Sequence, residues 1–343
     1  MLTRIEIDGF KSFLDFELDV PPFLALVGPN SSGKSNLLDA LAFARGALLA
    51  QGSKDVHDPL LSARRGKPQE LFHRPAGDDA VSEFTIRVRA VAERVSLAAA
   101  VHADRSGEWS VAWESAPAAL WPLEVRAWHH HLPDPTAMRR PASALDHRPL
   151  MEDAGNLAAV LGRMARDGQL DDLMVDLSAL VPDVTGVQPV LDERSEEWSF
   201  DLLVDHEPVP GRLASDGTLR VLALLAALYD GVSSGLLMVE EIENGLHPSR
   251  LGALLQRVAA RVGGNGGAWR QVILTTHSPV AVSTLYRSDP GSLVFLESAW
   301  RTGGGKPRSR VTVAKPVRQT GEPGTFASPR QVRNYLSTVG QAP

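Results

Sequence analysis

A glycine-rich segment near the N-terminus constrains the fold of this chain more than any other feature. Gly28 is followed by four residues and then by Gly33, Lys34 and Ser35, which is the spacing of a P-loop. An apolar run (FLALV) precedes the segment and leucines at helical spacing follow it, so the order is strand, loop and helix. Glycines let successive backbone N–H groups curl around a phosphate, and the helix dipole adds to their attraction. The sequence therefore predicts an α/β nucleotide-binding fold, with Lys34 on the β- and γ-phosphates and Ser35 on Mg²⁺.

Composition limits the class of protein and its compartment. The chain has 343 residues, of which 43% are hydrophobic, so it can form one large domain or two interleaved domains with a buried core. The absence of cysteine excludes disulfides and thiolate zinc sites. No apolar run reaches the roughly 18 residues that span a membrane, and the N-terminus has no secretory h-region. We therefore expect a cytoplasmic protein with no membrane contact.

Two short apolar runs end in polar residues that suit a phosphate site. The runs GLLMV and VILTT are typical of fully buried strands. Glu240 and Glu241 follow the first run, and His277 follows the second. In open α/β sheets, the chemistry lies at such strand ends. We predict that Glu240 helps to hold Mg²⁺, that Glu241 polarises the attacking water, and that His277 hydrogen-bonds the γ-phosphate.

Hydrophobic patterning indicates the rest of the fold. It predicts half-buried strands at 84–90 and 198–204, and core helices within 155–181. Six prolines between residues 117 and 149 exclude a long helix there, and a long coiled coil with it. The Gly/Pro/Arg-rich segment 301–310 is predicted to be a flexible loop.

The C-terminal region differs in charge from the rest of the chain. The net charge is −6, yet residues 301–333 contain eight Lys or Arg and one acid. This basic tail is a candidate for contact with phosphates or an acidic partner, and a solvated end is an equally good interpretation. The three consecutive histidines at 129–131 suggest a metal site. Because consecutive residues of a strand point to alternate faces, the three side chains are not expected to converge, and we predict no metal there.

A helix is predicted to begin after Ser215. A serine at the N-cap position precedes apolar residues at helical spacing, and taken alone this segment is a well-capped helix. Its position just before the two glutamates makes it similar to the signature motif of ABC-type ATPases. That resemblance implies that Ser215 and Gly217 close over the γ-phosphate bound by the opposite protomer. Asp216 replaces the usual middle glycine.

The four motifs in this order resemble the SMC/RecF/OLD-like branch of ABC-type ATPases, in its compact bacterial form without a long coiled coil or a Toprim nuclease domain. The resemblance covers nearly the whole chain and implies ATP and Mg²⁺ as ligands. It places Lys11 and Ser12, in the first hairpin, near the adenine and ribose. It assigns the phosphate loop to the segment GPNSSGKSN, whose residues are Gly28, Pro29, Asn30, Ser31, Ser32, Gly33, Lys34, Ser35 and Asn36.

The resemblance also implies an architecture. The fold is an α/β P-loop NTPase, an ABC-type ATPase head with an inserted, mainly helical lobe. Residues 1–125 and 236–343 are expected to form the nucleotide-binding lobe, with the P-loop, the glutamate strand and His277. Residues 126–235 are expected to form the inserted lobe that carries the signature motif.

Some positions depart from the family pattern. Glu240 stands where most ABC proteins have aspartate, although small bacterial relatives share the Glu-Glu form. Ile242 replaces a common proline, and His247 stands where many members have aspartate. These changes bear on the rate of hydrolysis rather than on nucleotide binding. No Q-loop glutamine is assigned, and for both candidates, Gln51 and Gln69, an ordinary surface glutamine is the better interpretation.

The function implied by the resemblance is a conformational switch. An ATPase of this kind dimerises head to tail with two ATP molecules between the subunits, and hydrolysis releases the dimer. A role in DNA maintenance or antiviral defence, beside a separate effector protein, is expected by analogy. A RecF-like clamp that contacts DNA is the alternative. An ATP-gated nuclease of the OLD type is disfavoured, because the 66 residues after His277 contain only three acids, Asp289, Glu297 and Glu322.

Overall fold

The chain folds into two compact units. The computed structural model describes residues 1–50, 67–92, 94–115, 118–232, 235–262, 271–303 and 306–339. The first unit comprises Met1–Trp128 with Gln271–Pro343, and the second comprises His129–Arg270. The strand before Glu240 therefore groups with the second unit, and the expected lobe boundaries, drawn from the motifs, stay a prediction. No helix among the described residues is long and apolar enough to cross a membrane.

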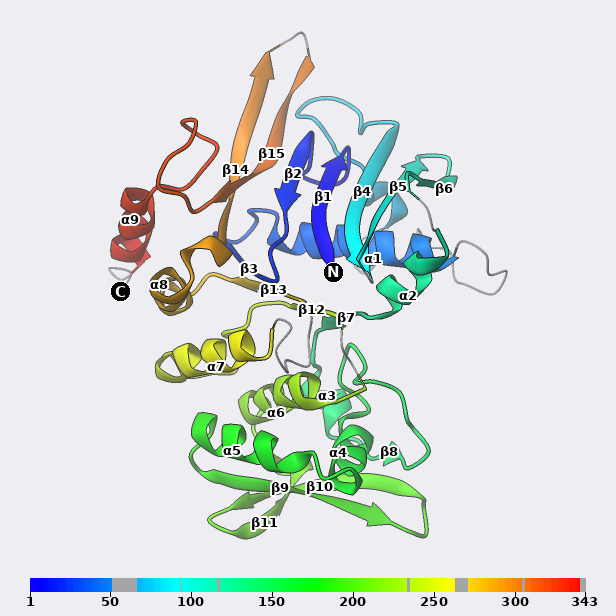
Figure 1. Ribbon diagram of the computed structural model, residues 1–343, viewed down its shortest axis with the longest axis vertical. Helices are drawn as coiled ribbons and strands as arrows, with labels where there is room; N and C mark the ends of the chain where they lie inside the picture. Colours follow the sequence, from blue (N-terminus) through cyan, green and yellow to red (C-terminus); the bar gives the residue numbers. More distant parts are fainter. Residues whose placement is uncertain are drawn as a thin grey trace. The chain divides into compact units, whose positions relative to one another are not determined.

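An antiparallel sheet forms one part of the first unit (Figure 1). The strands lie side by side in the order β2, β1, β4, β5, β6, and each neighbouring pair is antiparallel. Strand β4 buries alternate residues from Phe84 to Ala90, which confirms the half-buried strand predicted there. The bounds are β1 Leu2–Asp8, β2 Phe16–Asp19, β4 Glu83–Ala92, β5 Val95–Asp104 and β6 Trp109–Trp113.

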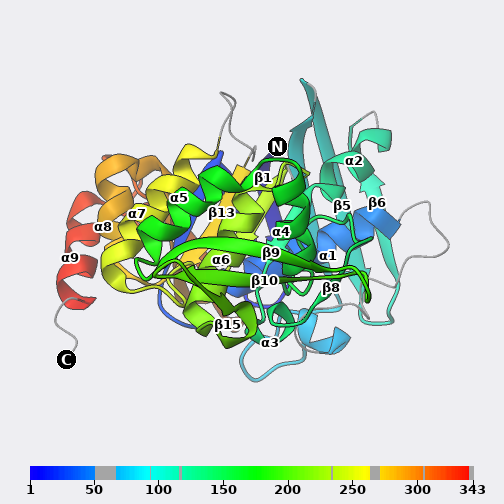
Figure 2. The same cartoon turned by 90° about the horizontal axis from the view of Figure 1, so that it is seen from below.

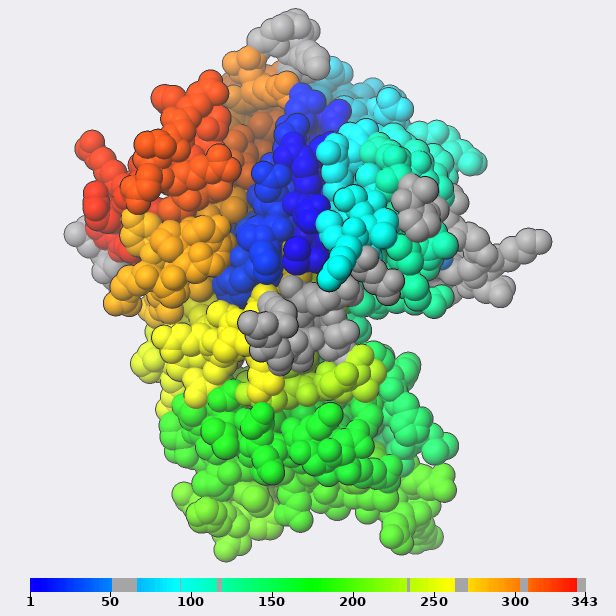
Figure 3. Space-filling model, viewed as in Figure 1, coloured from blue at the N-terminus to red at the C-terminus, as the bar shows by residue number. Residues whose placement is uncertain are grey.

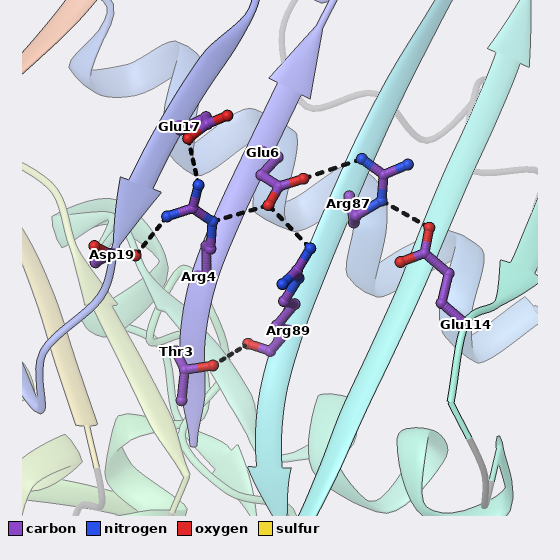
Figure 4. A network of polar contacts seen from close by, with 8 residues as sticks. All are labelled: Thr3, Arg4, Glu6, Glu17, Asp19, Arg87, Arg89 and Glu114. Atoms are coloured by element: carbon purple, nitrogen blue, oxygen red, sulfur yellow. Dashed lines mark hydrogen bonds and ion pairs between the residues drawn. The ribbon is translucent and has the colours of Figure 1, made fainter.

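The outer face of this sheet carries a charged network, shown in Figure 4. Arg4 contacts Glu6, Glu17 and Asp19, so that one guanidinium spans β1 and β2. Glu6 also accepts from Arg87 on β4 at 3.0 Å. The pKa of the Glu6 carboxyl is lowered because the Arg4 guanidinium hydrogen-bonds it, and Arg87 adds to the effect. Networks at a surface stabilise modestly, but opposite charges on adjacent strands favour this register over its alternatives.

A second set of strands positions the P-loop. Within the first unit, β3 (Phe23–Val27) pairs in parallel with β13 (Gln271–Thr276) on one side and with β14 (Leu293–Gly303) on the other. Every residue of β3 and β13 is buried, which confirms that VILTT lies in a fully buried strand. Strand β15 (Lys306–Pro316) pairs antiparallel with β14. For the described residues, the prediction of a flexible loop at 301–310 is therefore wrong, because Arg301 pairs with Ser309 and Trp300 with Arg310; Gly304 and Gly305 lie outside the described residues.

The face of the first unit seen in Figure 3 shows how these strands adjoin. The blue strands β1 and β2 lie between the cyan β4 and the orange β14–β15 hairpin. Contacts between β15 and β2 continue the surface from the antiparallel sheet to the hairpin. Ser12, a few residues before β2, accepts a hydrogen bond from the backbone N–H of Thr312 on β15 at 2.8 Å.

Helix α1 (Lys34–Ala50) follows the P-loop and packs on the antiparallel sheet. The predicted apolar face is confirmed, because Leu37, Leu38, Leu41 and Leu48 are fully buried. Phe43 of this helix meets Phe84 of β4 edge to face, with ring centroids 5.2 Å apart. Such a pair adds about 0.5–1.5 kcal/mol beyond its buried area. The other helical segments of this unit are η1 Pro68–Leu71, η2 Ala118–Leu120, α2 Trp121–Arg126, α8 Pro279–Ser288, η4 Pro290–Ser292 and α9 Pro329–Val339.

The second unit combines helices with a small sheet, and Figure 2 shows α4 and α5 over one face of β9 and β10. Strand β10 pairs with β9, β11 and β8, all antiparallel. Gly162 of α4 lets the ring of Trp198 approach, because a Cβ there would lie 2.3 Å from it. The bounds are α3 Pro135–Met138, β8 Ala142–Ser143, α4 Leu157–Arg166, α5 Leu170–Leu180, β9 Val184–Asp192, β10 Glu197–Val204, β11 Glu207–Pro210, η3 Gly211–Leu213, α6 Asp216–Tyr229, β12 Leu236–Val239 and α7 Pro248–Ala260; β7 (Trp128–His131) straddles the boundary between the units.

Candidate nucleotide site

Strand register brings the P-loop and His277 to one edge of the first unit. Val27 ends β3 and pairs with Thr276, which ends β13. Because the two strands are parallel, Gly28 and His277 both leave the sheet at its carboxyl edge, side by side. The sequence predicted strand ends at both places, and the parallel register confirms that they adjoin.

Two glycines are required by the shape of the P-loop. A Cβ at Gly28 would lie 2.4 Å from the carbonyl oxygen of Leu296 and 2.7 Å from Oγ of Ser32. Gly33 has φ +101°, and a Cβ there would lie 2.2 Å from Oγ1 of Thr312. Larger residues would force the loop off the neighbouring strands β14 and β15. Pro29, Asn30 and Ser31, between them, are exposed, so the turn of the loop faces outward.

Lys34 lies inside this loop. Its side chain is almost fully buried, and Nζ donates to the carbonyl oxygens of Gly28 at 2.6 Å and Pro29 at 3.0 Å. Oγ of Ser32 is buried and has no hydrogen-bond partner among the described residues. A buried ammonium held by carbonyls, with an unsatisfied hydroxyl beside it, fits an anionic ligand that would offer oxygen atoms to both. The binding of phosphate by this loop stays a prediction.

A hydrogen-bond chain fastens the loop from behind. Oγ1 of Thr312 donates to the carbonyl oxygen of Ser32 at 3.0 Å and lies 2.7 Å from Oγ of Ser12. Nδ2 of Asn36 donates to the same Ser12 hydroxyl at 2.9 Å. Ser12 therefore stands next to the P-loop, and its place near the adenine and ribose stays a prediction. No local pattern pointed to Thr312, which is 280 residues from Ser32 in the chain.

Lys11 has a second role that the sequence did not reveal. Its Nζ donates to Oδ2 of Asp39 on α1 at 2.7 Å, and both side chains are largely buried. A buried ion pair fixes geometry more than it stabilises the fold, because desolvation offsets much of the attraction. The pair ties the loop after β1 to the first turns of α1. Of the two Q-loop candidates, Gln51 lies outside the described residues, and Gln69 lies in η1 as an exposed side chain.

The backbone at His277 is held by the C-terminal helix. Oη of Tyr335, on α9, donates to the carbonyl oxygen of His277 at 3.0 Å. The Tyr335 ring packs edge to face on Phe295 of β14, with centroids 5.4 Å apart. The His277 side chain is exposed. Helix α9 therefore positions the strand end, and the final residues of the basic tail that the structure describes are helical.

The second unit carries the two glutamates at the end of a fully buried strand. Strand β12 ends at Val239, which confirms the buried strand predicted for GLLMV. The Glu240 side chain is 10% exposed, and its Oε1 lies 3.5 Å from Nε2 of His130. Glu241 has φ +45°, a left-handed conformation that costs a non-glycine residue roughly 1–3 kcal/mol. Its Oε2 accepts from Nδ2 of Asn244 at 2.7 Å, so the carboxylate is aimed by its own loop.

The histidine strand supports Glu240 rather than forming a separate centre. His131 is buried, and burial, with smaller effects of the neighbouring His130 and Arg220, lowers its pKa to about 3, so it is neutral at physiological pH. No group of three or more His, Asp or Glu residues with metal-holding geometry occurs in the part of the chain that the structure describes. The contact of His130 with Glu240 had no signal in the sequence beyond the histidine run itself.

The signature segment forms a capped helix start, as predicted. Oγ of Ser215 accepts from the backbone N–H of Thr218 at 3.1 Å, which makes it the N-cap of α6. Gly217 lies against Gly245 of the loop after Glu241, since a Cβ on Gly217 would meet the Gly245 carbonyl at 2.5 Å. Ser215 is exposed. We call residues 212–217 the signature turn and residues 240–245 the glutamate loop. The two segments are in direct contact through Gly217 and Gly245.

The P-loop with its lysine, the buried strand ending in two glutamates and the serine-capped helix together define the class. This chain is an ABC-type P-loop ATPase with an α/β fold, as the resemblance implies. It belongs to the family described as "AAA domain, putative AbiEii toxin, Type IV TA system", whose model matches residues 23–125 and 142–283.

Solved structures show the same fold. A structure of the Smc head bound to the C-winged helix domain of ScpA superposes with a TM-score of 0.64, at 13% identity, over 91% of this chain and 97% of that one. The Smc head domain with a coiled coil and joint from Pyrococcus yayanosii gives a TM-score of 0.61, at 10% identity, over 99% of both chains. At these identities the likeness establishes the fold.

Curated relatives match over short segments. The chromosome partition protein Smc of Methanocaldococcus jannaschii is 51% identical over 51 residues, which are 15% of this chain and 4% of the relative. The Smc protein of Rhodopseudomonas palustris is 50% identical over 48 residues, which are 13% of this chain and 4% of the relative. The matched part therefore spans about 4% of the length of these relatives.

Proposed function

We propose that this chain is an ATP-driven switch whose nucleotide sites form between two copies arranged head to tail. The observation that carries the proposal is the pairing of a P-loop with a buried lysine, in one unit, with an exposed, serine-capped signature turn in the other. The resemblance to ABC-type ATPases implies that this signature turn contacts the γ-phosphate of the nucleotide bound by the opposite protomer. An exposed Ser215 is available to such a partner.

The residues divide the work at the proposed site. Lys34 would transfer its hydrogen bonds from the loop carbonyls to phosphate oxygens, and the backbone N–H groups from Pro29 to Asn36, proline excepted, would cradle the same phosphates. His277 would bond the γ-phosphate and Glu241 would orient the attacking water. Lys11 and Ser12 would adjoin the nucleoside, with Lys11 held by Asp39.

The resemblance supports a magnesium ion held by two further oxygen ligands. Ser35 offers a hydroxyl and Glu240 a carboxylate, which are oxygen ligands that a hard cation prefers. The largely buried carboxylate of Glu240 sits where a bound cation would offset the cost of its burial. Bound there, the ion would neutralise charge on the phosphate oxygens.

The γ-phosphate supplies the switch. Each hydrogen bond to a charged oxygen is worth about 1.5–3 kcal/mol, so two or three contacts from Ser215 and Gly217 of a second copy are enough to hold a dimer. Hydrolysis removes the group that those contacts recognise, and the dimer opens. The output of the cycle is the approach and separation of the two chains, to which an effector protein can respond.

The measurement that tests this proposal is the solution mass of Glu241→Gln by light scattering, with and without Mg-ATP. The substitution is expected to slow turnover while leaving ATP bound, so the mass should double when ATP is added. The same substitution combined with Ser215→Arg should remain monomeric although it binds ATP. A Glu241→Gln protein that binds ATP and keeps a monomer mass would contradict the head-to-tail switch.

A separate effector and a DNA-related role remain parts of the proposal. One solved Smc head with this fold is bound to the C-winged helix domain of ScpA, and the curated relative from Methanocaldococcus jannaschii is a chromosome partition protein. By that likeness we propose a partner protein and a role in DNA maintenance or antiviral defence. The physical basis of this proposal is the approach and separation of the two chains, which a separate protein bound to them can follow.

A DNA clamp is the second candidate, and the β14–β15 hairpin favours it. Trp300 is 52% exposed, and the Arg308 guanidinium lies over its ring at 4.1 Å. Arg310, opposite Trp300 in the register, is exposed and donates to Ser298 at 2.7 Å. An exposed aromatic ring with two guanidinium groups on one face suits stacking with a base and contact with phosphates.

The clamp is tested by fluorescence anisotropy with labelled single- and double-stranded DNA at two salt concentrations. Trp300→Ala combined with Arg308→Ala is expected to weaken binding and to lower the slope of log affinity against log salt by about one. Arg194→Ala, on an exposed turn of the second unit, is the control that should bind normally. Absence of binding at low salt, or equal binding by all three proteins, would exclude the clamp at this hairpin.

A further inference from the structure

Arg139, in the second unit, hydrogen-bonds the signature turn on both sides of Ser215. Nη2 of Arg139 donates to the carbonyl oxygen of Ala214 at 2.8 Å and to Oδ1 of Asp216 at 2.7 Å. Its Nε donates to the carbonyl oxygen of Arg212 at 3.1 Å. The guanidinium fork thus meets three acceptors within five residues of chain, and Ser215 lies between two of them. A planar group with donors in fixed directions restricts the turn in a way that a single contact does not.

The arginine itself comes from a well-anchored place. It follows the short helix α3, whose N-cap Asp134 accepts from the backbone of Thr136 at 2.9 Å. Met138, the residue before it, is fully buried, and α3 packs against α6. On its other side the turn is backed by the contact of Gly217 with Gly245. The signature turn is therefore held between Arg139 and the loop that follows Glu241.

The exposure of Arg139 and Asp216 indicates that their contact fixes the geometry of the signature turn and adds little to the folding stability. The Arg139 side chain is 29% exposed and Asp216 is 66% exposed. An ion pair in that setting contributes little to folding, with measured values of about 0–1 kcal/mol. Asp216 is also the residue that replaces the usual glycine of the signature motif, and the structure gives that departure a purpose, since it supplies the carboxylate that Arg139 holds.

We propose that Arg139 is a positioning residue for the signature motif, which orients Ser215 and Gly217 toward the γ-phosphate bound by a second copy of this chain. The proposal rests on the head-to-tail arrangement proposed above. Misplacement of a positioned group by about 1 Å can cost on the order of 100-fold in rate. Arg139→Ala is therefore expected to keep the affinity for ATP, which resides on the P-loop, while turnover falls by about 10- to 100-fold.

Mixing two variants, one inactive and one of reduced activity, tests the role in trans. Lys34→Ala lacks a working P-loop but keeps its signature turn, and Arg139→Ala has the converse defect. In an equal mixture, half of the dimers would be mixed, and each would contain one intact composite site. Roughly a quarter of the unmodified activity should then return if the sites act independently in a closed two-fold dimer. A merely structural defect of the Arg139→Ala chain would not be repaired by mixing.

Controls separate this inference from the proposed function. Lys34→Ala mixed with Ser215→Arg reports whether signatures act in trans at all. Recovery in both mixtures supports the proposal, and recovery with Ser215→Arg alone overturns the role of Arg139 but leaves the switch standing. Recovery in neither mixture overturns the trans arrangement and the role of Arg139 with it. Full turnover by Arg139→Ala alone would also overturn that role.

Two further variants distinguish a loss of positioning from misfolding. Arg140→Ala changes the next residue, whose side chain is exposed and makes no hydrogen bond or ion pair with the signature turn among the described residues, and it should behave as the unmodified protein. Arg139→Lys keeps a charge but loses the fork, so its turnover should lie between those of the unmodified protein and Arg139→Ala. If Arg139→Ala is unfolded in thermal melts, the mixing test is made with Arg139→Lys, and the same recovery is required of it.

Discussion

Lys34→Ala should abolish nucleotide binding by this protein. The lysine ammonium lies buried in the P-loop, where it donates to the carbonyl oxygens of Gly28 and Pro29. A phosphate oxygen is a better partner for a cation than a carbonyl, because its charge strengthens the bond. Loss of two charge-assisted bonds of about 1.5–3 kcal/mol each corresponds to a fall in affinity of at least 100-fold.

Calorimetric titration with a slowly hydrolysed ATP analogue measures this loss. Lys67→Ala, which removes another lysine of the first unit on the exposed residue before η1, is the matched control and should bind normally. Thermal unfolding of both variants shows whether the loop still folds, since Lys34 also bridges its own backbone. Affinity within tenfold of the unmodified value, in a folded Lys34→Ala protein, would show that the nucleotide lies elsewhere.

Local patterns located the P-loop and the strands around it because the information is contained in a few neighbouring residues. The glycine spacing, the apolar run before it and the leucines after it specify strand, loop and helix without reference to the rest of the chain. The parallel register that aligns Val27 with Thr276 then follows from two buried runs whose ends must share an edge. In this part of the molecule, the residues that specify the secondary structure also form the candidate site.

The β14–β15 hairpin shows where local composition misleads. Glycines and a proline between Thr302 and Arg308 predict a loop, yet the flanking residues pair from Val294 with Pro316 to Arg301 with Ser309. Strand β14 is fixed by its parallel pairing with β3, which lies far away in the sequence, and that pairing carries β15 with it. Strand propensity depends on such neighbours, which composition does not encode.

The supporting residues of the site were beyond sequence reasoning for the same reason. Thr312 meets Ser32 across 280 residues of chain, and Arg139 meets Asp216 across 77. Neither residue belongs to a motif, and each acts through a backbone carbonyl or a carboxylate that only the fold brings near. The motif residues could be named in advance, whereas the contacts that hold them in place could not.

Glu241→Gln should separate ATP binding from hydrolysis. The substitution keeps the size of the side chain, and an amide can still accept the hydrogen bond from Nδ2 of Asn244, so the loop and its left-handed residue should be preserved. What is lost is the negative charge that draws a proton from water as the phosphate is attacked. General-base catalysis of this kind contributes about 10²- to 10⁴-fold, and we expect turnover to fall within that range while ATP affinity changes little.

The rate of phosphate release under saturating ATP measures turnover. Titration with magnesium distinguishes the role of Glu240 from that of Glu241. Glu240→Gln is expected to raise the magnesium concentration needed for half-maximal rate, because it removes a proposed ligand of the ion. Glu241→Gln should lower the maximal rate without that shift, and Glu193→Gln, on an exposed turn, should alter neither. If Glu241→Gln hydrolyses ATP as fast as the unmodified protein, the water is activated by another group, and the left-handed strain at Glu241 serves the contact of its loop with the signature turn instead.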